Sequence, residues 1–162
     1  MERMNSETPS SLLLNGDLTQ LVIGAFYDTY NDLGSGFPEF VTRRALAIVI
    51  REAGLSVFEE VELPVWFHGQ KLAGFRADLL VADKLIVEVK TSLSMEAFHQ
   101  AQVLHYLKAT NHEVGLLVNF GREPQFKRVV YSEARKRRHF DPPTAAALQP
   151  QAADESGGTP AP

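Results

Sequence analysis

Apolar residues recur three or four positions apart near the start of the chain, which predicts helices. Residues 18–33 follow this spacing, and Asp17 with Gln20 resembles a capping box, so we predict a first helix there. The Gly-Ser-Gly sequence at 34–36 separates it from a second helix over residues 37–53, in whose first turn Pro38 can lie. Its middle, residues 45–50, is apolar on every side, which predicts that this part is buried.

From residue 55 the chain is rich in β-branched and aromatic residues, which is typical of strands. We predict a turn at residues 68–70 and strands over residues 55–67, 72–81 and 85–91. Ser94 can cap a third helix. That helix and the two strands after it are predicted over residues 95–110, 113–120 and 127–131. The elements together predict an α/β domain with a central mixed sheet flanked by helices.

The length and composition fit one domain with its own core. Of the 162 residues, 44% are hydrophobic, and we place the domain at residues 17–132. Residues 1–16 are predicted to be a flexible N-terminal segment. Residues 133–162 start with a basic run at 135–138 and continue rich in Pro, Ala and Gly, so we predict a disordered tail. A solvated tail is favoured for the basic run, with contact to nucleic acid phosphates as the alternative.

Cysteine and charge exclude several function classes. The chain has no cysteine, which excludes disulfides, thiolate zinc sites and cysteine nucleophiles. His99 and His105 are spaced so that they lie on different helix faces, which argues against zinc bound by histidines. The formal net charge of −4 argues against a protein that mainly grips long stretches of duplex phosphate. The first residues fit neither a signal peptide nor a membrane span, and we expect a cytoplasmic protein.

Three charged residues, Asp78, Glu88 and Lys90, lie in predicted strands that are otherwise aliphatic. Side chains alternate along a strand, so Glu88 and Lys90 share one face. A two-residue loop between these strands would separate Asp78 from them, whereas a three-residue loop at residues 82–84 would pair Asp78 with Glu88. A charge cluster exposed on a solvated sheet face is the plain alternative.

Two carboxylates that lie close together repel each other unless one is protonated or a cation lies between them. Mg²⁺ prefers carboxylate, carbonyl and water oxygens, so Asp78, Glu88 and the backbone carbonyl of Val89 are candidate ligands. Such an ion polarises a phosphoryl oxygen and makes a bound water more acidic. Lys90 could orient that water or offset charge that develops on the phosphate. From these residues alone the exposed charge cluster is favoured, and a Mg²⁺ site for phosphate chemistry is the alternative.

Five local sequences resemble those of the GxxExxY protein family, a group placed in the PD-(D/E)XK nuclease superfamily. They are GSGFPE at 34–39, RADLLV at 76–81, IVEVK at 86–90, QVLHYLKAT at 102–110 and GLLVNFG at 115–121. The resemblance covers residues 30–132 and implies a restriction-endonuclease-like fold.

The resemblance also implies a catalytic site. Asp78 and Glu88 match the metal ligands of the superfamily pattern, and Lys90 matches its catalytic lysine. Glu39 matches the acidic residue that the preceding helix supplies. Taken from the residues alone, Glu39 and Arg43 would be an exposed ion pair one helical turn apart.

Three further positions bear on this resemblance. Gln102 and Tyr106 match a Gln-x-x-x-Tyr element of a RecB-like branch, and we expect them to position water or the substrate backbone. The alternative is a buried tyrosine with a satisfied hydroxyl and a partly exposed glutamine. The signature tyrosine of the family falls at Thr42, so its phenol is missing here or replaced by another side chain.

The sequence thus predicts a nuclease that hydrolyses phosphodiester bonds of DNA or RNA with Mg²⁺, or Mn²⁺ in its place. Nucleic acid is the expected partner, no membrane is expected, and a homodimer is considered because many small nucleases of this kind work as pairs. The alternative is a non-catalytic module that binds nucleic acid or protein and retains the fold. Hydrolysis of a small phosphate compound would use the same site.

Overall fold

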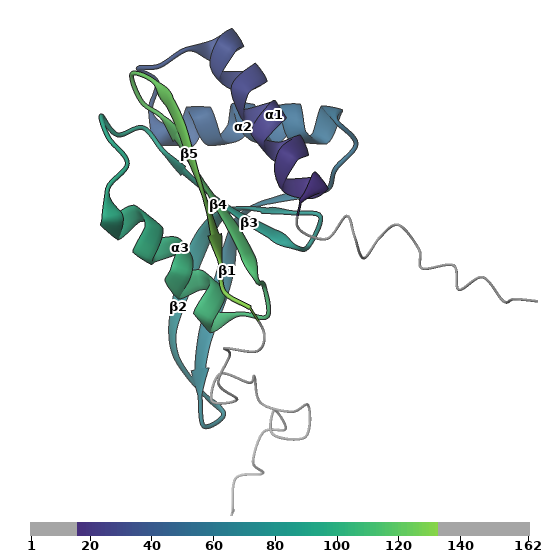
Figure 1. The fold of residues 1–162 in the computed structure, drawn as a ribbon. Helices are drawn as coiled ribbons and strands as arrows, with labels where there is room; N and C mark the ends of the chain where they lie inside the picture. Colours follow the sequence, from purple (N-terminus) through teal and green to yellow (C-terminus); the bar gives the residue numbers. More distant parts are fainter. Residues whose placement is uncertain (1–15, 133–162) are drawn as a thin grey trace, which may run out of the picture.

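The computed structural model describes residues 16–132, which form a five-stranded sheet between two layers of helices (Figure 1). The strands are β1 (Val57–Phe67), β2 (Gln70–Val81), β3 (Leu85–Lys90), β4 (Val114–Phe120) and β5 (Pro124–Val130). The helices are α1 (Asp17–Leu33), α2 (Glu39–Glu52) and α3 (Ala97–Ala109). The predicted flexible segment and the predicted disordered tail with its basic run lie outside the described residues, except for Gly16.

The strands lie in chain order, β1-β2-β3-β4-β5, and all neighbours are antiparallel except β3 and β4. A parallel pair needs a crossover connection, which α3 supplies here. This arrangement confirms the predicted α/β domain with a mixed sheet. Among the described helices, none has the length and hydropathy needed to cross a membrane.

The two faces of the sheet build two separate cores. Leu85, Val87 and Val89 of β3 pack in one cluster with buried residues of α1 and α2. The alternate residue Ile86 packs in the other cluster with Leu107 of α3. Side chains two positions apart on a strand point to the same face of the sheet. Glu88 and Lys90 therefore point, like Ile86, toward the face that α3 covers.

The loop between β2 and β3 has three residues, which confirms the alternative that pairs the two acids. Val81 pairs with Leu85, and the register continues to Leu79 opposite Val87. Ala82 and Asp83 in the loop have positive φ angles of 51° and 56°. Extension of this register by one residue brings Asp78 opposite Glu88.

Two predicted helix starts are wrong. The first helix begins at Asp17 itself with no side-chain cap, so the capping box with Gln20 is absent. The third helix is preceded by Glu96 instead of Ser94, and the Glu96 N–H donates to Nδ1 of His99 at 3.1 Å. His99 therefore takes the place that Glu or Gln usually has in a capping box. A sequence search for Glu or Gln at that position does not find this cap.

The apolar middle of α2 is buried on one side only. Leu46, Ala47 and Ile50 are fully buried, whereas Ile48 is 54% exposed. The prediction that residues 45–50 are buried throughout is thus wrong for Ile48, because α2 covers the sheet with one face and no described element covers the other.

Gly115 of β4 allows α3 to pack closely on the sheet. A Cβ atom at this position would lie 2.3 Å from Cγ1 of Val103 in α3. We expect Gly115→Ala to lower the free energy of unfolding by about 1–3 kcal/mol, because the closely packed helix has to move.

Gly24 in α1 provides the control for this substitution. Among the described residues, no atom lies within 4 Å of a Cβ built there. Gly24→Ala is therefore expected to raise the free energy of unfolding by about 0.5–1 kcal/mol, through helix propensity. Chemical denaturation measures both variants, and an equal loss of stability in the two would refute this account of Gly115.

Candidate active site

Strands β2 and β3 separate after their third residue pair, and the space between them is called the fork below. Backbone pairing ends at Leu79 opposite Val87, while β3 continues beside β4 as far as Lys90. In this fork the N–H of Val89 donates to Oδ2 of Asp78 at 2.8 Å. A carboxylate thus takes the hydrogen bond that a continued ladder would give to a backbone carbonyl, and Asp78 is held against β3.

Glu88 is a buried carboxylate with one satisfied oxygen. Its Oε1 accepts a hydrogen bond from Nζ of Lys90 at 3.0 Å, and the residue is 3% exposed. Within residues 16–132, its Oε2 has no hydrogen-bond partner. A buried unsatisfied carboxylate oxygen is costly, so this atom marks a position where a ligand would be stabilising.

The three acids of the predicted site all have raised pKa values. Burial, followed by repulsion from Asp78, raises the pKa of Glu88 to about 7 in spite of the Lys90 ammonium. Burial also raises the pKa of Asp78, although the Val89 N–H and Lys90 oppose the shift. The pKa of Glu39 is raised mainly by burial too. The site therefore favours either protons or another cation among these carboxylates.

Lys90 behaves as a cation in this environment. Burial acts to lower its pKa, but the carboxylates of Glu88, Glu39 and Asp78 outweigh burial, so the pKa lies above its usual value. The Glu88 pKa rises across the same ion pair because the glutamate side chain is 4% exposed and the lysine side chain 15%. The loss of hydration thus falls more heavily on Glu88, and Lys90 keeps its proton.

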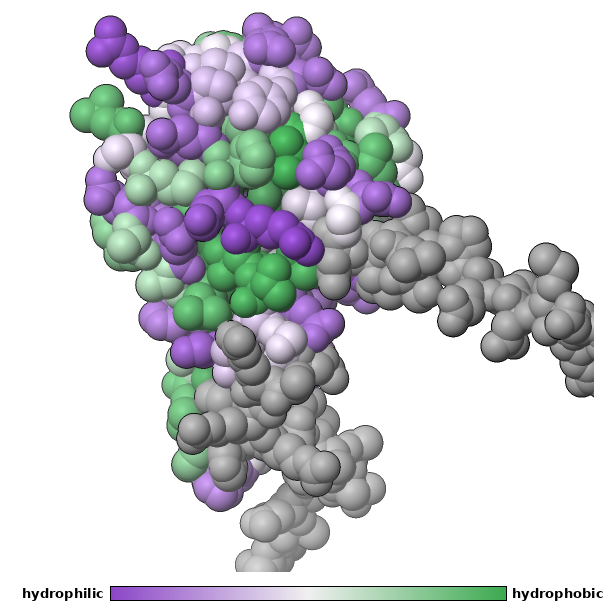
Figure 2. Space-filling model, viewed as in Figure 1, coloured by the Kyte–Doolittle hydropathy of each residue, from purple (hydrophilic) through white to green (hydrophobic). Residues whose placement is uncertain are grey.

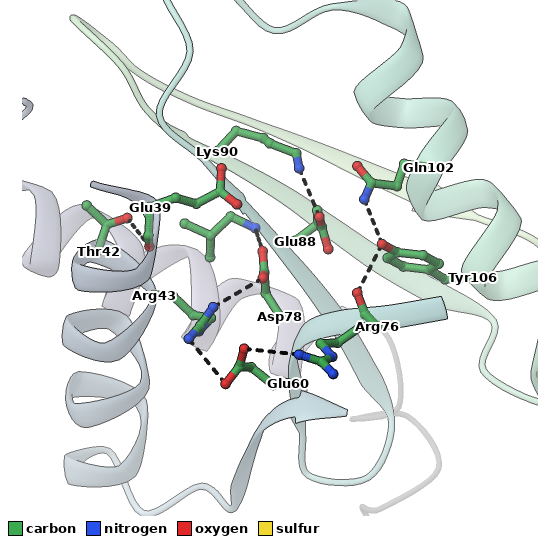
Figure 3. A network of polar contacts seen from close by, with 11 residues as sticks. Glu39, Thr42, Arg43, Glu60, Arg76, Asp78, Glu88, Lys90, Gln102 and Tyr106 are labelled. Carbon is green, nitrogen blue, oxygen red and sulfur yellow. Dashed lines mark hydrogen bonds and ion pairs between the residues drawn. The ribbon is translucent and has the colours of Figure 1, made fainter. Parts of the chain in front are cut away.

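The predicted acids and Lys90 come together from three elements (Figure 3). Glu39 lies in the first turn of α2 and points toward Asp78 of β2 and Lys90 of β3. The side chains of Asp78 and Lys90 are 13% and 15% exposed. The alternative of a charge cluster exposed on a solvated sheet face is therefore wrong.

Arg43 and Glu60 belong to the same polar network, although the sequence did not indicate this. Arg43 of α2 lies 3.8 Å from Oδ1 of Asp78 and 3.6 Å from Oε2 of Glu60. Its side chain is 12% exposed, so the interpretation of Glu39 and Arg43 as an exposed ion pair is wrong. Glu60 also lies 3.7 Å from Arg76. These contacts place a guanidinium next to one of the predicted metal ligands.

Glu60 has an unusual backbone conformation for a strand residue. Its φ is 53°, and it lies between the paired residues Glu59 and Val61, which face Leu79 and Ala77 of β2. A positive φ is uncommon for glutamate and often occurs near functional sites. Strand periodicity contains no signal for such a residue, so sequence reasoning could not find it.

Gln102 and Tyr106 form a short relay on α3. The Tyr106 hydroxyl donates to the Arg76 carbonyl at 3.1 Å and accepts from Nε2 of Gln102 at 2.7 Å. Because the carbonyl can only accept and the hydroxyl has one proton, the glutamine must present its NH₂ group to Tyr106. Its Oε1 then points toward Lys90 (Figure 3). The tyrosine is thus buried with a satisfied hydroxyl, as the alternative from sequence described, and the role of the pair toward water or substrate stays a prediction.

Two further buried residues shape the ends of the site. Thr42, where the sequence resemblance would place a tyrosine, is fully buried and its hydroxyl donates to the Glu39 carbonyl at 2.9 Å. Asn119 bonds both the N–H and the carbonyl of Ser92, each at 2.9 Å. Asn119 thereby fixes the chain just after Lys90. The signal for it was a single amide side chain in the apolar strand β4.

The acids fit a dication by their chemistry but do not form a ready-made cage. Among the residues that the structure describes, no three acidic or histidine side chains are grouped closely enough to hold a metal ion. Asp78 and Glu88 nevertheless offer the oxygen ligands that Mg²⁺ prefers, and one of them, Oε2 of Glu88, has no hydrogen-bond partner in the described part of the chain. Arg43 and Lys90 supply the positive charge that faces the two carboxylates in this structure.

Residues 16–129 match the family model described as the PD-(D/E)XK nuclease superfamily. The chain belongs to this superfamily. The mixed sheet with three helices confirms the restriction-endonuclease-like fold that the sequence predicted. The superfamily assignment supports a nuclease-type fold.

Comparison with solved structures finds the crystal structure of SSO0001, which is 22% identical to the chain with a TM-score of 0.46. The alignment covers 78% of this chain and 64% of that one, so the chain spans less than two thirds of its length. No curated protein matches the chain.

Proposed function

We propose that the protein is a Mg²⁺-dependent nuclease that hydrolyses phosphodiester bonds of DNA or RNA. The observation that supports this most is the buried Oε2 of Glu88, which has no hydrogen-bond partner among residues 16–132 and lies in a residue next to Asp78 and Lys90. A dication at this place would satisfy the oxygen and favour the ionised form of both carboxyls, whose pKa values are raised mainly by burial. Membership in the nuclease superfamily favours the same substrate class.

In this proposal Asp78 and Glu88 would hold the ion, and Glu39 and the Val89 carbonyl would supply further oxygen ligands. The chemistry that Mg²⁺, or Mn²⁺ in its place, would supply there is polarisation of a phosphoryl oxygen and a more acidic water. Lys90 orients the attacking water and offsets charge on the phosphate. Its raised pKa keeps the amine protonated, so the side chain carries the positive charge that this role needs.

Gln102 and Tyr106 act in the proposal as a positioning pair. The Tyr106 hydroxyl fixes the amide of Gln102 so that Oε1 can accept a hydrogen bond from water or from the Lys90 ammonium. The substrate contact is therefore assigned to Gln102, with Tyr106 behind it. Assignment to the GxxExxY group, a homodimeric state and a cytoplasmic location remain predictions from sequence.

Tyr106→Phe is expected to reduce kcat about tenfold with a smaller effect on KM. The substitution removes the hydroxyl that donates to the Arg76 carbonyl and accepts from the Gln102 amide. The carbonyl and the amide are then left unsatisfied, at a cost of about 1–3 kcal/mol. Steady-state kinetics measures the split between kcat and KM. Gln102→Glu, which cannot donate to the tyrosine, should lower kcat similarly; full activity in both variants would refute the relay.

The nuclease proposal is tested by incubation of the protein with single- and double-stranded DNA and RNA in Mg²⁺ or Mn²⁺. Cleavage that requires the metal and is lost in Glu88→Gln supports it. Absence of cleavage on all four substrates, or cleavage that survives this substitution unchanged, contradicts it.

A non-catalytic binding module is the second candidate, and the position of Arg43 favours it. The guanidinium already lies beside Asp78, as a substitute cation would. In such a module, nucleic acid or protein would bind equally well with a chelator present and in Asp78→Asn. Metal-dependent binding that is lost in this variant favours the nuclease instead.

A further inference from the structure

A groove follows the seam between α1 and α2. One part, of about 710 Å³, is lined by both helices and has Leu21, Ala25 and Val49 among its apolar residues. A second part, of about 220 Å³, adjoins it, because Val49 lines both. Leu21 is 53% exposed and Ile48, in the second part, is 54% exposed. The two helices therefore leave apolar side chains uncovered along their seam.

The charged residues of this groove all have the same sign. Asp17, Asp28 and Glu52 line the larger part and Asp32 lines the smaller, and none of the described lining residues is basic. Four carboxylates repel nucleic acid phosphates and attract lysine and arginine. The charge therefore argues for a protein partner with basic residues and against nucleic acid.

Gly24 gives an independent indication that something approaches this groove. It lies inside α1, where glycine costs about 1 kcal/mol relative to alanine. A Cβ atom there would meet no described atom within 4 Å, so packing inside the domain does not require glycine. The missing side chain deepens the groove and permits the backbone of a partner to come close. Figure 2 shows apolar surface next to hydrophilic surface on the face of the molecule that carries α1.

We propose that the α1–α2 groove binds a basic amphipathic helix of another protein. A helix is the natural occupant because it presents apolar residues at i, i+3, i+4 and i+7 with flanking charges. The 17 residues of α1 span about 25 Å, which matches a partner helix of about 17 residues. Lysine or arginine on both flanks would pair with the acidic rim. The proposal does not depend on the nuclease activity.

The chain itself offers no segment with both required properties. Residues 1–15 contain three adjacent leucines, at positions 12–14, but Arg3 is their one basic residue. The basic run at 135–138 has Phe140 and Leu148 as the large apolar residues after it. A separate protein that combines an apolar stripe with basic flanks therefore fits the groove better than either end of this chain.

The test uses a fluorescein-labelled helical peptide of about 18 residues with a leucine stripe flanked by lysines. A matched peptide carries glutamate in place of lysine. By fluorescence anisotropy, we expect saturable binding of the lysine peptide to the full chain and at least about tenfold weaker binding of the glutamate peptide. Equal binding of the two peptides, or no binding of either, would overturn the proposal.

Three variants locate the binding. Gly24→Trp fills the groove from a helix position with open space, and Asp28→Lys reverses one rim charge. Both substitutions are expected to weaken binding of the lysine peptide at least about tenfold. Glu123→Lys changes net charge equally at an exposed position outside the groove and should bind like the unmodified protein. Thermal melting confirms that the variants are folded, and unchanged binding in Gly24→Trp would contradict the assignment.

Other occupants would show themselves in the same measurements. A variant with serine at positions 12–14, or with alanine at 135–138, that binds the peptide tenfold more tightly would reveal an end of the chain in the groove. If the molecular mass of the unmodified protein doubles as its concentration rises, and that of Gly24→Trp does not, a second copy of the chain occupies the groove. Direct binding of a labelled oligonucleotide that is lost in Gly24→Trp would indicate nucleic acid in the groove. Each of these three results overturns the proposal of a separate basic helix.

Discussion

Lys90→Ala is expected to reduce the rate of metal-dependent phosphodiester cleavage by about a hundredfold to a thousandfold. Lys90 is held by Glu88 at 3.0 Å and kept protonated by three carboxylates, so it is a fixed positive charge in a partly buried site. Preorganised charge of this kind, aimed at charge that develops in the transition state, is worth about 3–4 kcal/mol when one donor is lost. Most of the loss should appear in kcat, because the lysine acts on the reacting phosphate.

Two further substitutions make this result specific. Lys84→Ala removes an exposed lysine from the β2–β3 loop and should retain full activity. Lys90→Arg keeps the charge but alters its shape, and should recover part of the rate. Cleavage time courses under single-turnover conditions measure all three. Equal activity of Lys90→Ala and Lys84→Ala would show that Lys90 has no role in the reaction.

The metal-free protein is expected to lose stability by about 3 kcal/mol as the pH rises from about 4.5 to about 7. The folded-state pKa of Glu88 lies at about 7, above its ordinary value of 4.5. Between these values the unfolded chain has released the Glu88 proton while the folded protein retains it. The folded state thus binds more protons, so the free energy of unfolding falls as pH rises through this window and then levels off. The raised pKa of Asp78 acts in the same direction.

Glu88→Gln isolates this contribution, because glutamine has nearly the same shape and no proton to lose. Denaturant unfolding at several pH values should give a much flatter profile for this variant, which should be the more stable protein near neutral pH. Addition of Mg²⁺ at pH 8 should stabilise the unmodified protein and leave Glu88→Gln unchanged. Parallel pH profiles of the two proteins would mean that burial of Glu88 costs little.

The helices and strands could be predicted from sequence because each follows a simple period. The predicted strand over residues 85–91 and the observed Leu85–Lys90 differ by one residue, for example. The proximity of Asp78 to Glu88 depended on the length of one loop, which sequence left open and the structure resolves as three residues. Hydrophobic periodicity predicts toward which face of the sheet each strand residue points. Once the loop length is known, the register follows, and it places Asp78 opposite Glu88.

The remaining parts of the site depend on contacts that no local pattern contains. Arg43 meets Asp78 and Glu60 across three elements, and Glu60 reaches them through a positive φ. Asn119 contacts Ser92 across 27 positions of the chain. Such contacts follow from tertiary packing, so a single sequence could at most mark Asn119 as a polar residue in an apolar strand.

Calorimetric titration with Mg²⁺ and Mn²⁺ tests most directly whether a dication belongs between Asp78 and Glu88. At pH 8, where the Glu88 carboxyl is ionised, we expect saturable binding that weakens at least about tenfold in Asp78→Asn and in Glu88→Gln. Glu123→Gln, outside the site, should bind like the unmodified protein. At pH 6 the binding should be weaker and release protons, because the ion displaces the proton of Glu88. Binding of equal strength in all four proteins, or no binding in any of them, would contradict the account.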